Sequence, residues 1–140
     1  MISSAYSDPS ASSVSVVDFS SGCGHVGLLI AAVFPSVSVT LLDVKGVAIE
    51  IAAKRAEAAG LTNVRTFQCS IREFPPSIPC DVAVPLHACG DASDDVLQIS
   101  VERCAALVME PCCVGSLATP GLSSHPVSYT HLTLPTILLV

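Results

Sequence analysis

Three glycines and an acidic residue in the first third of the chain have the spacing of a nucleotide-binding turn. Gly22, Gly24 and Gly27 follow a short apolar run, and Asp43 comes directly after the next one. Glycines let the backbone turn sharply and approach a ligand closely. A helix beginning at His25 would add unpaired N–H groups, and Asp43 can accept hydrogen bonds from ribose hydroxyls. The spacing predicts a site for an adenosine-type cofactor at the strand ends.

Charge near the turn bears on which cofactor it holds. The glycine pattern also satisfies the dinucleotide fingerprint, but a pyrophosphate would lie close to Asp18. S-adenosylmethionine (SAM) instead carries an ammonium and a sulfonium, two cations that Asp18 would attract. The difference between attracting these cations and repelling a pyrophosphate is worth several kcal/mol at an effective dielectric constant of about 20. The residues favour SAM. An NAD(P)-binding oxidoreductase domain and a plain strand–turn–helix are the alternatives.

Alternating strands and helices are expected to position this turn. Short β-branched runs predict five strands at Val14–Phe19, Val37–Leu42, Val64–Cys69, Asp81–Leu86 and Ala105–Glu110. Helical patterns lie between them at His25–Val33, Gly46–Ala59 and Ser93–Cys104. Gly60 is placed to end the second helix. Continuous apolar strands that alternate with helices predict an α/β fold, an open parallel sheet covered by helices on both faces.

Three motifs carry a resemblance to a known family. Residues 16–27 (VVDFSSGCGHVG) resemble the first motif of class I SAM-dependent methyltransferases. Residues 86–94 (LHACGDASD) and 108–115 (VMEPCCVG) resemble the methyltransferase-like domain of glutathione S-transferase C-terminal-domain-containing proteins. They are also similar to tRNA 2′-O-methyltransferases. The resemblance covers roughly residues 14–115 and implies a Rossmann-like fold, SAM as cofactor and RNA as the substrate class.

The resemblance also implies which residues contact the cofactor. Seven positions match the family's motifs, namely Asp18, Ser20, Gly22, Gly24, Asp43, Val44 and Ser70. The first four would line the methionine part. Asp43 would bind the ribose and Val44 would lie beside the adenine. Ser70 stands where many of these enzymes place an acidic group for the adenine amino nitrogen.

His87 and Asp91 are the candidate catalytic residues, because they follow the fourth predicted strand, next to the expected position of the transferable methyl. His87 would act as a general base for a hydroxyl, since its unperturbed pKa near 6.5 suits neutral pH. Asp91 would orient it. The alternatives are a structural histidine bonded to the backbone, and an aspartate that caps a helix beginning near Ala92.

A metal site is the alternative to this interpretation. His87, Cys89, Cys112 and Cys113 follow neighbouring strands and supply the nitrogen and sulfur ligands that zinc prefers. Adjacent cysteines do not easily bind one ion, however, and neither pair has the usual spacing. We therefore predict no metal, and expect Cys112 and Cys113 to pack at the end of the fifth strand or to contact cofactor or substrate.

Composition limits the other classes. The chain has 140 residues, 51% of them hydrophobic and 13% charged, with a net charge of −6. Such a composition excludes a disordered acidic tail and argues against broad, non-specific binding to nucleic acid. An RNA-binding surface would have to come from missing regions or from a partner.

Cysteines and chain ends indicate the compartment. Seven cysteines, an odd number with two adjacent, suit reduced thiols better than a disulfide framework. No secretory signal pattern is present, and glycines and Pro35 interrupt the uncharged stretch Phe19–Leu42. A cytoplasmic protein without a membrane span is expected.

Three segments are expected along the chain. Residues 1–13 form a Ser-rich N-terminal segment, 14–115 the domain, and 116–140 a linker and tail. Within the tail, Val127–Thr136 reads like a translated sequencing-library adapter, so the native sequence is expected to end near Ser124. The antiparallel strand pair that usually completes this sheet has no convincing counterpart, which suggests a fragment.

Overall fold

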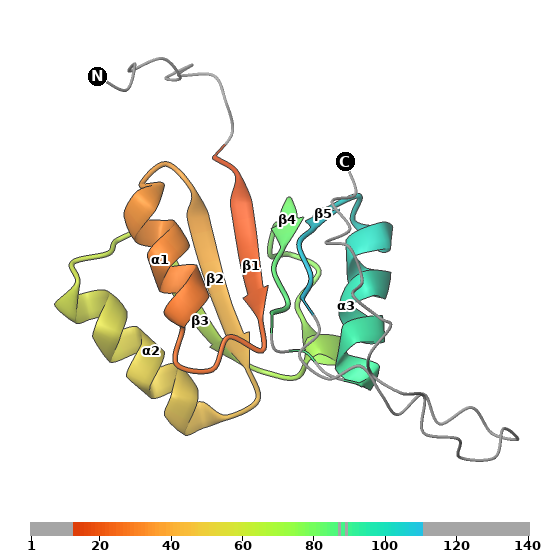
Figure 1. The fold of residues 1–140 in the computed structure, drawn as a ribbon, viewed down its shortest axis with the longest axis horizontal. Helices are drawn as coiled ribbons and strands as arrows, with labels where there is room; N and C mark the ends of the chain where they lie inside the picture. Colours follow the sequence, from red (N-terminus) through yellow and green to blue (C-terminus); the bar gives the residue numbers. More distant parts are fainter. Residues whose placement is uncertain (1–12, 87, 89, 111–140) are drawn as a thin grey trace, which may run out of the picture.

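A central parallel sheet organises the part of the chain that the computed structural model describes, residues 13–86, 88 and 90–110 (Figure 1). Its five strands are β1 (Ser15–Phe19), β2 (Ser38–Asp43), β3 (Val64–Gln68), β4 (Val82–Ala83) and β5 (Ala106–Leu107). They lie in the order β3-β2-β1-β4-β5, and every pair is parallel. The order reverses between β1 and β4, which makes the carboxyl ends of these strands the expected ligand-binding edge.

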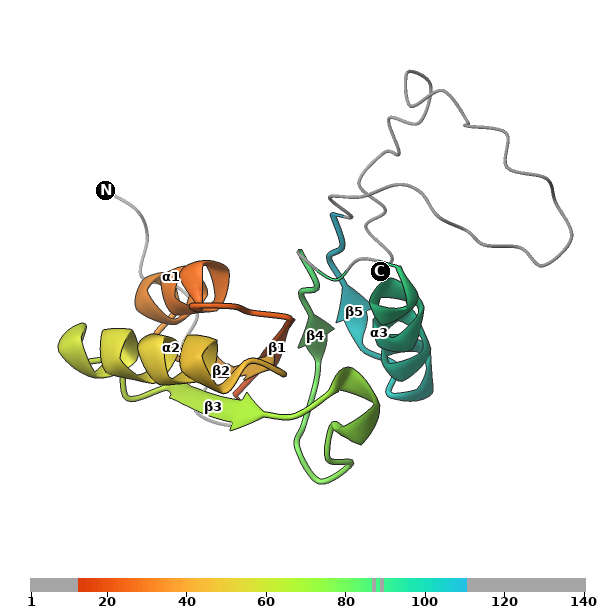
Figure 2. The same cartoon turned by 90° about the horizontal axis from the view of Figure 1, so that it is seen from below.

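Helices cover both faces of the sheet, as predicted. Helices α1 (His25–Val33) and α2 (Gly46–Ala58) lie side by side on one face, and α3 (Asp91–Glu102) with the short 3-10 helix η1 (Ile71–Glu73) covers the other (Figure 2). Alternate residues of β1 point to opposite faces, so Val16 packs under α1 and α2 while Val17 and Phe19 pack under α3 and η1. A core on each side therefore holds the sheet.

The second helix ends as the sequence predicts. Gly60 adopts a left-handed φ of 66°. Its N–H donates to the carbonyl of Glu57 at 2.9 Å, and the N–H of Leu61 donates to that of Ala56 at 3.0 Å. This pair of bonds is the Schellman arrangement, in which a glycine satisfies the last helical carbonyls.

The last two strands are shorter than predicted. The expected strands Asp81–Leu86 and Ala105–Glu110 shrink to two residues each. Pro85 has no N–H to give to a strand ladder, and its ring fixes φ, so β4 cannot continue through it. The third helix begins at Asp91 instead of Ser93. The apolar runs correctly predicted that these strands exist, but they did not predict where the hydrogen bonding of each strand ends.

Several predictions concern residues outside the described part. Most of the N-terminal segment, all of the tail, and any antiparallel pair after β5 fall in residues 1–12 or 111–140. Among the described helices, none is both long and apolar enough to cross a bilayer. The cysteines described as free thiols are Cys23, Cys69, Cys80 and Cys104.

Candidate cofactor site

The turn between β1 and α1 has a backbone that only a few residue types adopt easily. Gly22 and Gly24 have φ values of 53° and 77°, and Ser20 adopts 58° in the same left-handed region. The N–H of Gly24 donates to the carbonyl of Ser21 at 2.9 Å and closes the turn. Gly24 is also the residue that precedes α1. The two glycines thus supply the sharp turn that their spacing predicted.

Asp18 connects β1 to the first turn of α1. Its Oδ2 accepts a hydrogen bond from the N–H of Gly27 at 3.0 Å, and the residue is only 3% exposed. Gly27 must lack a side chain, because a Cβ there would lie 2.2 Å from Cδ2 of Leu41 and 3.0 Å from Asp18 itself. The glycine therefore lets the helix approach the sheet closely enough for this bond.

Burial sets the acidity of Asp18. The pKa of the carboxyl is raised from 3.8 to about 7, mainly by burial; the Gly27 bond opposes this rise, and the nearby Asp43 adds to it. Asp18 is thus divided between its neutral and charged forms near pH 7. The structure places it at the base of the turn, and its contact with the methionine part stays a prediction.

Asp43 ties the end of β2 to the same turn. Its Oδ2 accepts from the N–H of Gly22 at 2.8 Å, and its Oδ1 accepts from the N–H of Lys45 at 2.9 Å. A carboxylate oxygen has two lone pairs, so each oxygen retains acceptor capacity for a ribose hydroxyl. Val44, the next residue, is 60% exposed. The structure brings together Asp43, Val44 and the glycine turn at one edge of the sheet.

The described residues leave room and free donors for a cofactor here. A Cβ built on Gly22 would meet no atom within 4 Å. No described residue accepts a hydrogen bond from the N–H of Cys23, His25 or Val26. The buried hydroxyl of Ser21 also lacks a partner among the described residues. Open N–H groups at a helix start suit an anionic group such as the SAM carboxylate, so the residues fit this cofactor.

Ser70 is already engaged. Its hydroxyl donates to Oε2 of Glu73 at 2.9 Å, and its N–H donates to the same oxygen at 3.2 Å. Both bonds hold the pKa of Glu73 below its usual value. Sequence reasoning missed Glu73, although the Ser-x-x-Glu spacing is the signature of such a capping interaction. A carboxylate therefore stands beside the position where the resemblance implies an acidic group.

The end of β3 also touches the segment after β2. Nε2 of Gln68 lies 3.4 Å from the carbonyl oxygen of Val44, and a Cβ on Gly46 would lie 2.8 Å from Oε1 of Gln68. Gly46 thus leaves space for the Gln68 amide to lie against this loop. Sequence spacing gave no signal for the contact, because the two segments meet only in the folded sheet.

Only one of the two predicted catalytic residues, Asp91, lies in the described part of the chain. His87 and Cys89 lie outside the described residues, as do Cys112 and Cys113. Asp91 is exposed and is the first residue of α3, and Gly90 occupies the cap position without a side-chain bond. The interpretation of Asp91 as a cap for a helix near Ala92 is therefore wrong, because the helix starts one residue earlier.

Two further observations concern the edge after β4. The hydroxyl of Ser93 donates to the carbonyl of Ala88 and ties the start of α3 to the preceding loop, a contact that the sequence did not indicate. Within the described ranges, no cluster of three His, Cys, Asp or Glu side chains has a geometry that could hold a metal ion.

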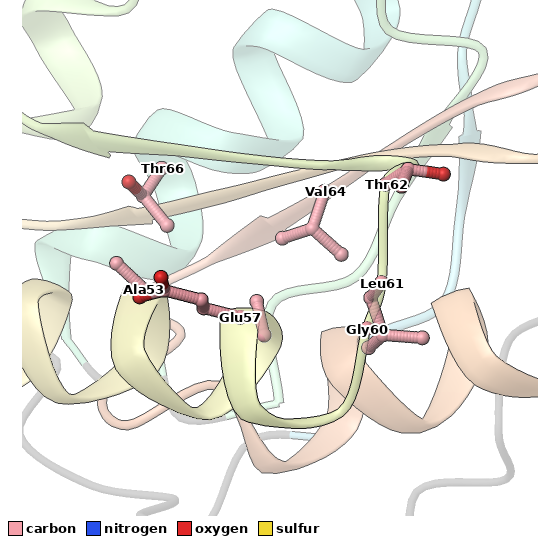
Figure 3. Close-up of a pocket in the computed structure, with 8 residues that line it drawn as sticks. Ala53, Glu57, Gly60, Leu61, Thr62, Val64 and Thr66 are labelled. Carbon is pink, nitrogen blue, oxygen red and sulfur yellow. The ribbon is translucent and has the colours of Figure 1, made fainter.

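The pocket drawn in Figure 3 is separate from this site. It has a volume of about 400 Å³ and lies between the end of α2 and β3, with Glu57, Leu61, Val64 and Thr66 among its lining residues. Val64 begins β3, so the pocket extends from the amino end of that strand. Cofactors of open α/β sheets bind at the carboxyl ends, where the glycine turn and Asp43 lie.

Comparison with known proteins identifies the family to which the chain belongs. A family model described as a methyltransferase domain matches residues 1–120. The human glutathione S-transferase C-terminal domain-containing protein is 36% identical over 113 residues, covering 81% of this chain and 18% of the human protein. Ribosomal RNA small subunit methyltransferase G of Porphyromonas gingivalis is 46% identical over 55 residues, 39% of this chain and 25% of that protein. The chain thus spans about a fifth of the length of the human relative.

Solved structures share the fold. PKMT2 from Rickettsia typhi in complex with AdoHcy superposes with a TM-score of 0.60 at 20% identity, covering 69% of this chain and 20% of that one. An rRNA methylase from Streptococcus thermophilus gives 0.58 at 16% identity, covering 69% of this chain and 60% of that one. The chain therefore belongs to the methyltransferase-domain family, and its Rossmann-like fold is that of the class I methyltransferases.

Proposed function

We propose that this domain binds SAM and transfers its methyl group to an acceptor. The observation that carries the proposal is the bond between Asp43 and the N–H of Gly22, which joins the end of β2 to the glycine turn in a chain of the methyltransferase family. SAM supplies an electrophilic methyl on its sulfonium and leaves as S-adenosylhomocysteine. The chain supplies position, because holding the methyl in line with a nucleophile accounts for much of such a rate enhancement.

Each part of the cofactor has candidate partners. Open N–H groups at the start of α1 face the expected place of the carboxylate, with Asp18 below the turn for the ammonium. Asp43 accepts from the ribose hydroxyls, and Val44 lies against the adenine. Glu73, held beside Ser70, supplies the acceptor for the adenine amino group. Proton removal from the acceptor is assigned to His87, with Asp91 as its orienting group.

RNA is the proposed acceptor. The support comes from two similar proteins, the P. gingivalis relative and the S. thermophilus neighbour, whose names describe methylation of ribosomal RNA. Charge gives no support, since the chain carries −6 overall. Of its six basic residues, Arg72 pairs with Asp95 and Arg103 donates to backbone carbonyls. The main RNA-binding surface would therefore lie outside this chain, on a longer form or on a partner.

The cofactor is tested by isothermal titration of wild-type protein, Asp43→Ala and Glu50→Ala with SAM and S-adenosylhomocysteine. Glu50 is exposed on α2 and controls for the loss of one negative charge. We expect saturable binding by wild type and Glu50→Ala, and at least tenfold weaker binding by Asp43→Ala. A folded wild-type protein that binds neither ligand would contradict the proposal. An NADH fluorescence titration should stay flat.

The acceptor is tested with methyl-tritiated SAM. Incubation with total RNA and with a cell lysate should label RNA, because the proposed nucleophile is a hydroxyl or base nitrogen of that polymer. Label in protein alone would contradict the RNA assignment. Cofactor binding without label in any fraction would identify a non-catalytic domain that has kept the fold.

A reducing compartment, the cytoplasm, is proposed as the location. Its support is that four thiols in the described part are free. Burial raises the pKa of Cys80 to about 11, so this thiol stays protonated and inert at neutral pH. Fractionation of cells that express a tagged chain would test the assignment, and secretion into the medium would contradict it.

A further inference from the structure

We infer that Arg55 is a positioning residue that fixes the glycine turn from outside and thereby sets how tightly the amino-acid end of SAM is held. The inference rests on the proposed function. Arg55 is an exposed residue of α2, and its Nη1 donates a hydrogen bond to the carbonyl oxygen of Cys23 at 2.8 Å. Cys23 lies between Gly22 and Gly24. A side chain from the neighbouring helix therefore holds the middle of the turn.

Arg55 completes the restraint of one peptide unit. The Cys23–Gly24 peptide has its carbonyl bonded to Arg55, and its N–H donates to the carbonyl of Ser21 at 2.9 Å. Because a peptide unit is planar, holding both of its ends fixes the plane. The N–H of Gly22 is fixed separately by Asp43. The N–H of Cys23 lies between these two fixed groups, so its direction is restrained as well. No described residue accepts a hydrogen bond from it, which leaves it available for a ligand.

The turn needs such a tether because packing supports only one side of it. A Cβ on Gly24 would lie 3.2 Å from the Cβ of Ala52, so this glycine rests against α2. Gly22 has no atom within 4 Å of the same position, and glycines have more conformational freedom than other residues. Arg55 follows Ala52 by one helical turn and reaches the unpacked part. Donors that are held in place before binding lose less entropy when a ligand arrives.

Two ligands separate this role from a general structural one. S-adenosylhomocysteine has the amino-acid end that faces the turn, whereas 5′-deoxy-5′-methylthioadenosine keeps the adenosine and the sulfur but lacks that end. Titration calorimetry on the whole chain should show that Arg55→Ala weakens binding of S-adenosylhomocysteine roughly five- to tenfold, and leaves methylthioadenosine within about twofold. Lys54→Ala, at the neighbouring exposed position, should leave both affinities unchanged. Arg55→Lys should recover part of the loss, since an ammonium can donate one hydrogen bond.

Ionic strength distinguishes the tether from attraction between the guanidinium and the ligand's carboxylate. A tether predicts that the ratio of wild-type to Arg55→Ala affinity persists in about 0.5 M NaCl, where attraction between exposed charges is screened. Unchanged binding of S-adenosylhomocysteine by Arg55→Ala, equal weakening of both ligands, or a ratio that vanishes in salt would each overturn the inference. Circular dichroism melts confirm that each variant is folded. If folded wild-type protein bound no S-adenosylhomocysteine, the proposed function itself would fail.

Discussion

The two halves of the sheet are built differently. On one side of the switch point, β1, β2 and β3 have five or six residues each. On the other side, β4 and β5 have two residues each. Every described member of the predicted cofactor site except Ser70 lies on β1, on β2 or in the loops that follow them. The half with the predicted cofactor site, called the cofactor half below, is thus the one with extended strand pairing.

Side chains compensate in the second half. Arg103 donates from Nη1 to the carbonyl of Ile78 at 2.6 Å and from Nη2 to that of Pro75 at 3.1 Å. Its guanidinium also lies 4.4 Å from the centre of the Phe74 ring. One arginine thereby holds a loop that no strand or helix organises. The comparison teaches that extended strand pairing secures the sheet of the cofactor half, while the second half, with its short strands, depends more on individual side-chain contacts.

The largest expected effect contrasts a core leucine from each half. Leu41→Ala should lower the free energy of unfolding by about 3–5 kcal/mol, because Leu41 is fully buried against Gly24 and Gly27 and its truncation leaves a cavity in the core. Leu107→Ala, on a two-residue strand, should cost about 2 kcal/mol. Urea unfolding of both variants checks this. Equal losses would remove the contrast between the halves.

Next in size is the pH dependence that arises from Asp18 in the cofactor half. Its pKa of about 7 in the folded protein exceeds the ordinary 3.8, so the folded state binds the proton more tightly and stability falls as pH rises from about 4 to about 7. The fall attributable to Asp18 is at most about 4 kcal/mol. It is measured as the difference between wild type and Asp18→Asn in urea unfolding across that range. If the free energy of unfolding of wild type minus that of Asp18→Asn stays constant or increases with pH, Asp18 is not held as a buried acid.

In the second half, Arg103→Ala should lower the free energy of unfolding by about 2 kcal/mol, because two carbonyls lose a charge-assisted donor and Phe74 loses its cation. Chemical denaturation is the measurement, and Arg103→Lys should restore part of the loss. A neutral Arg103→Ala would mean that side-chain tethers do not secure this half.

The smallest effect is expected at the other arginine of that half. Arg72 forms a 2.9 Å ion pair with Asp95 but is 70% exposed, so water screens the attraction. Arg72→Ala should leave the urea midpoint within experimental error. A loss as large as that of Arg103→Ala would show that the exposed ion pair stabilises the second half as much as the Arg103 hydrogen bonds do.

Much of the cofactor half could be predicted from the sequence, because its signals are local. The helix His25–Val33 is confirmed residue for residue, and Gly60 ends the second helix as expected. Glycine spacing identified a turn at the end of β1. In the second half the apolar runs overestimated β4 and β5, since hydropathy does not report where a ladder of hydrogen bonds ends.

The contacts that hold the site were beyond local reasoning. Arg55 and Cys23 lie 32 residues apart, and nothing in either segment indicates that they meet. Asp18 was expected to face the cofactor, and its bond to Gly27 becomes visible only once α1 is packed on the sheet. Residue types could be predicted to matter here, but the atoms they bond to depend on the tertiary arrangement.

Strand order also imposes a sequence of events in time. By Gln68 the chain has emerged with everything needed to pair β1, β2 and β3. The other edge of β1 stays unpaired until Val82 is made, because its partner on that side is β4, which begins at Val82. An unpaired edge in a nascent sheet can recruit a strand from another chain. Between the synthesis of Gln68 and that of Val82, the central strand β1 therefore has one unpaired edge at which mispairing can occur.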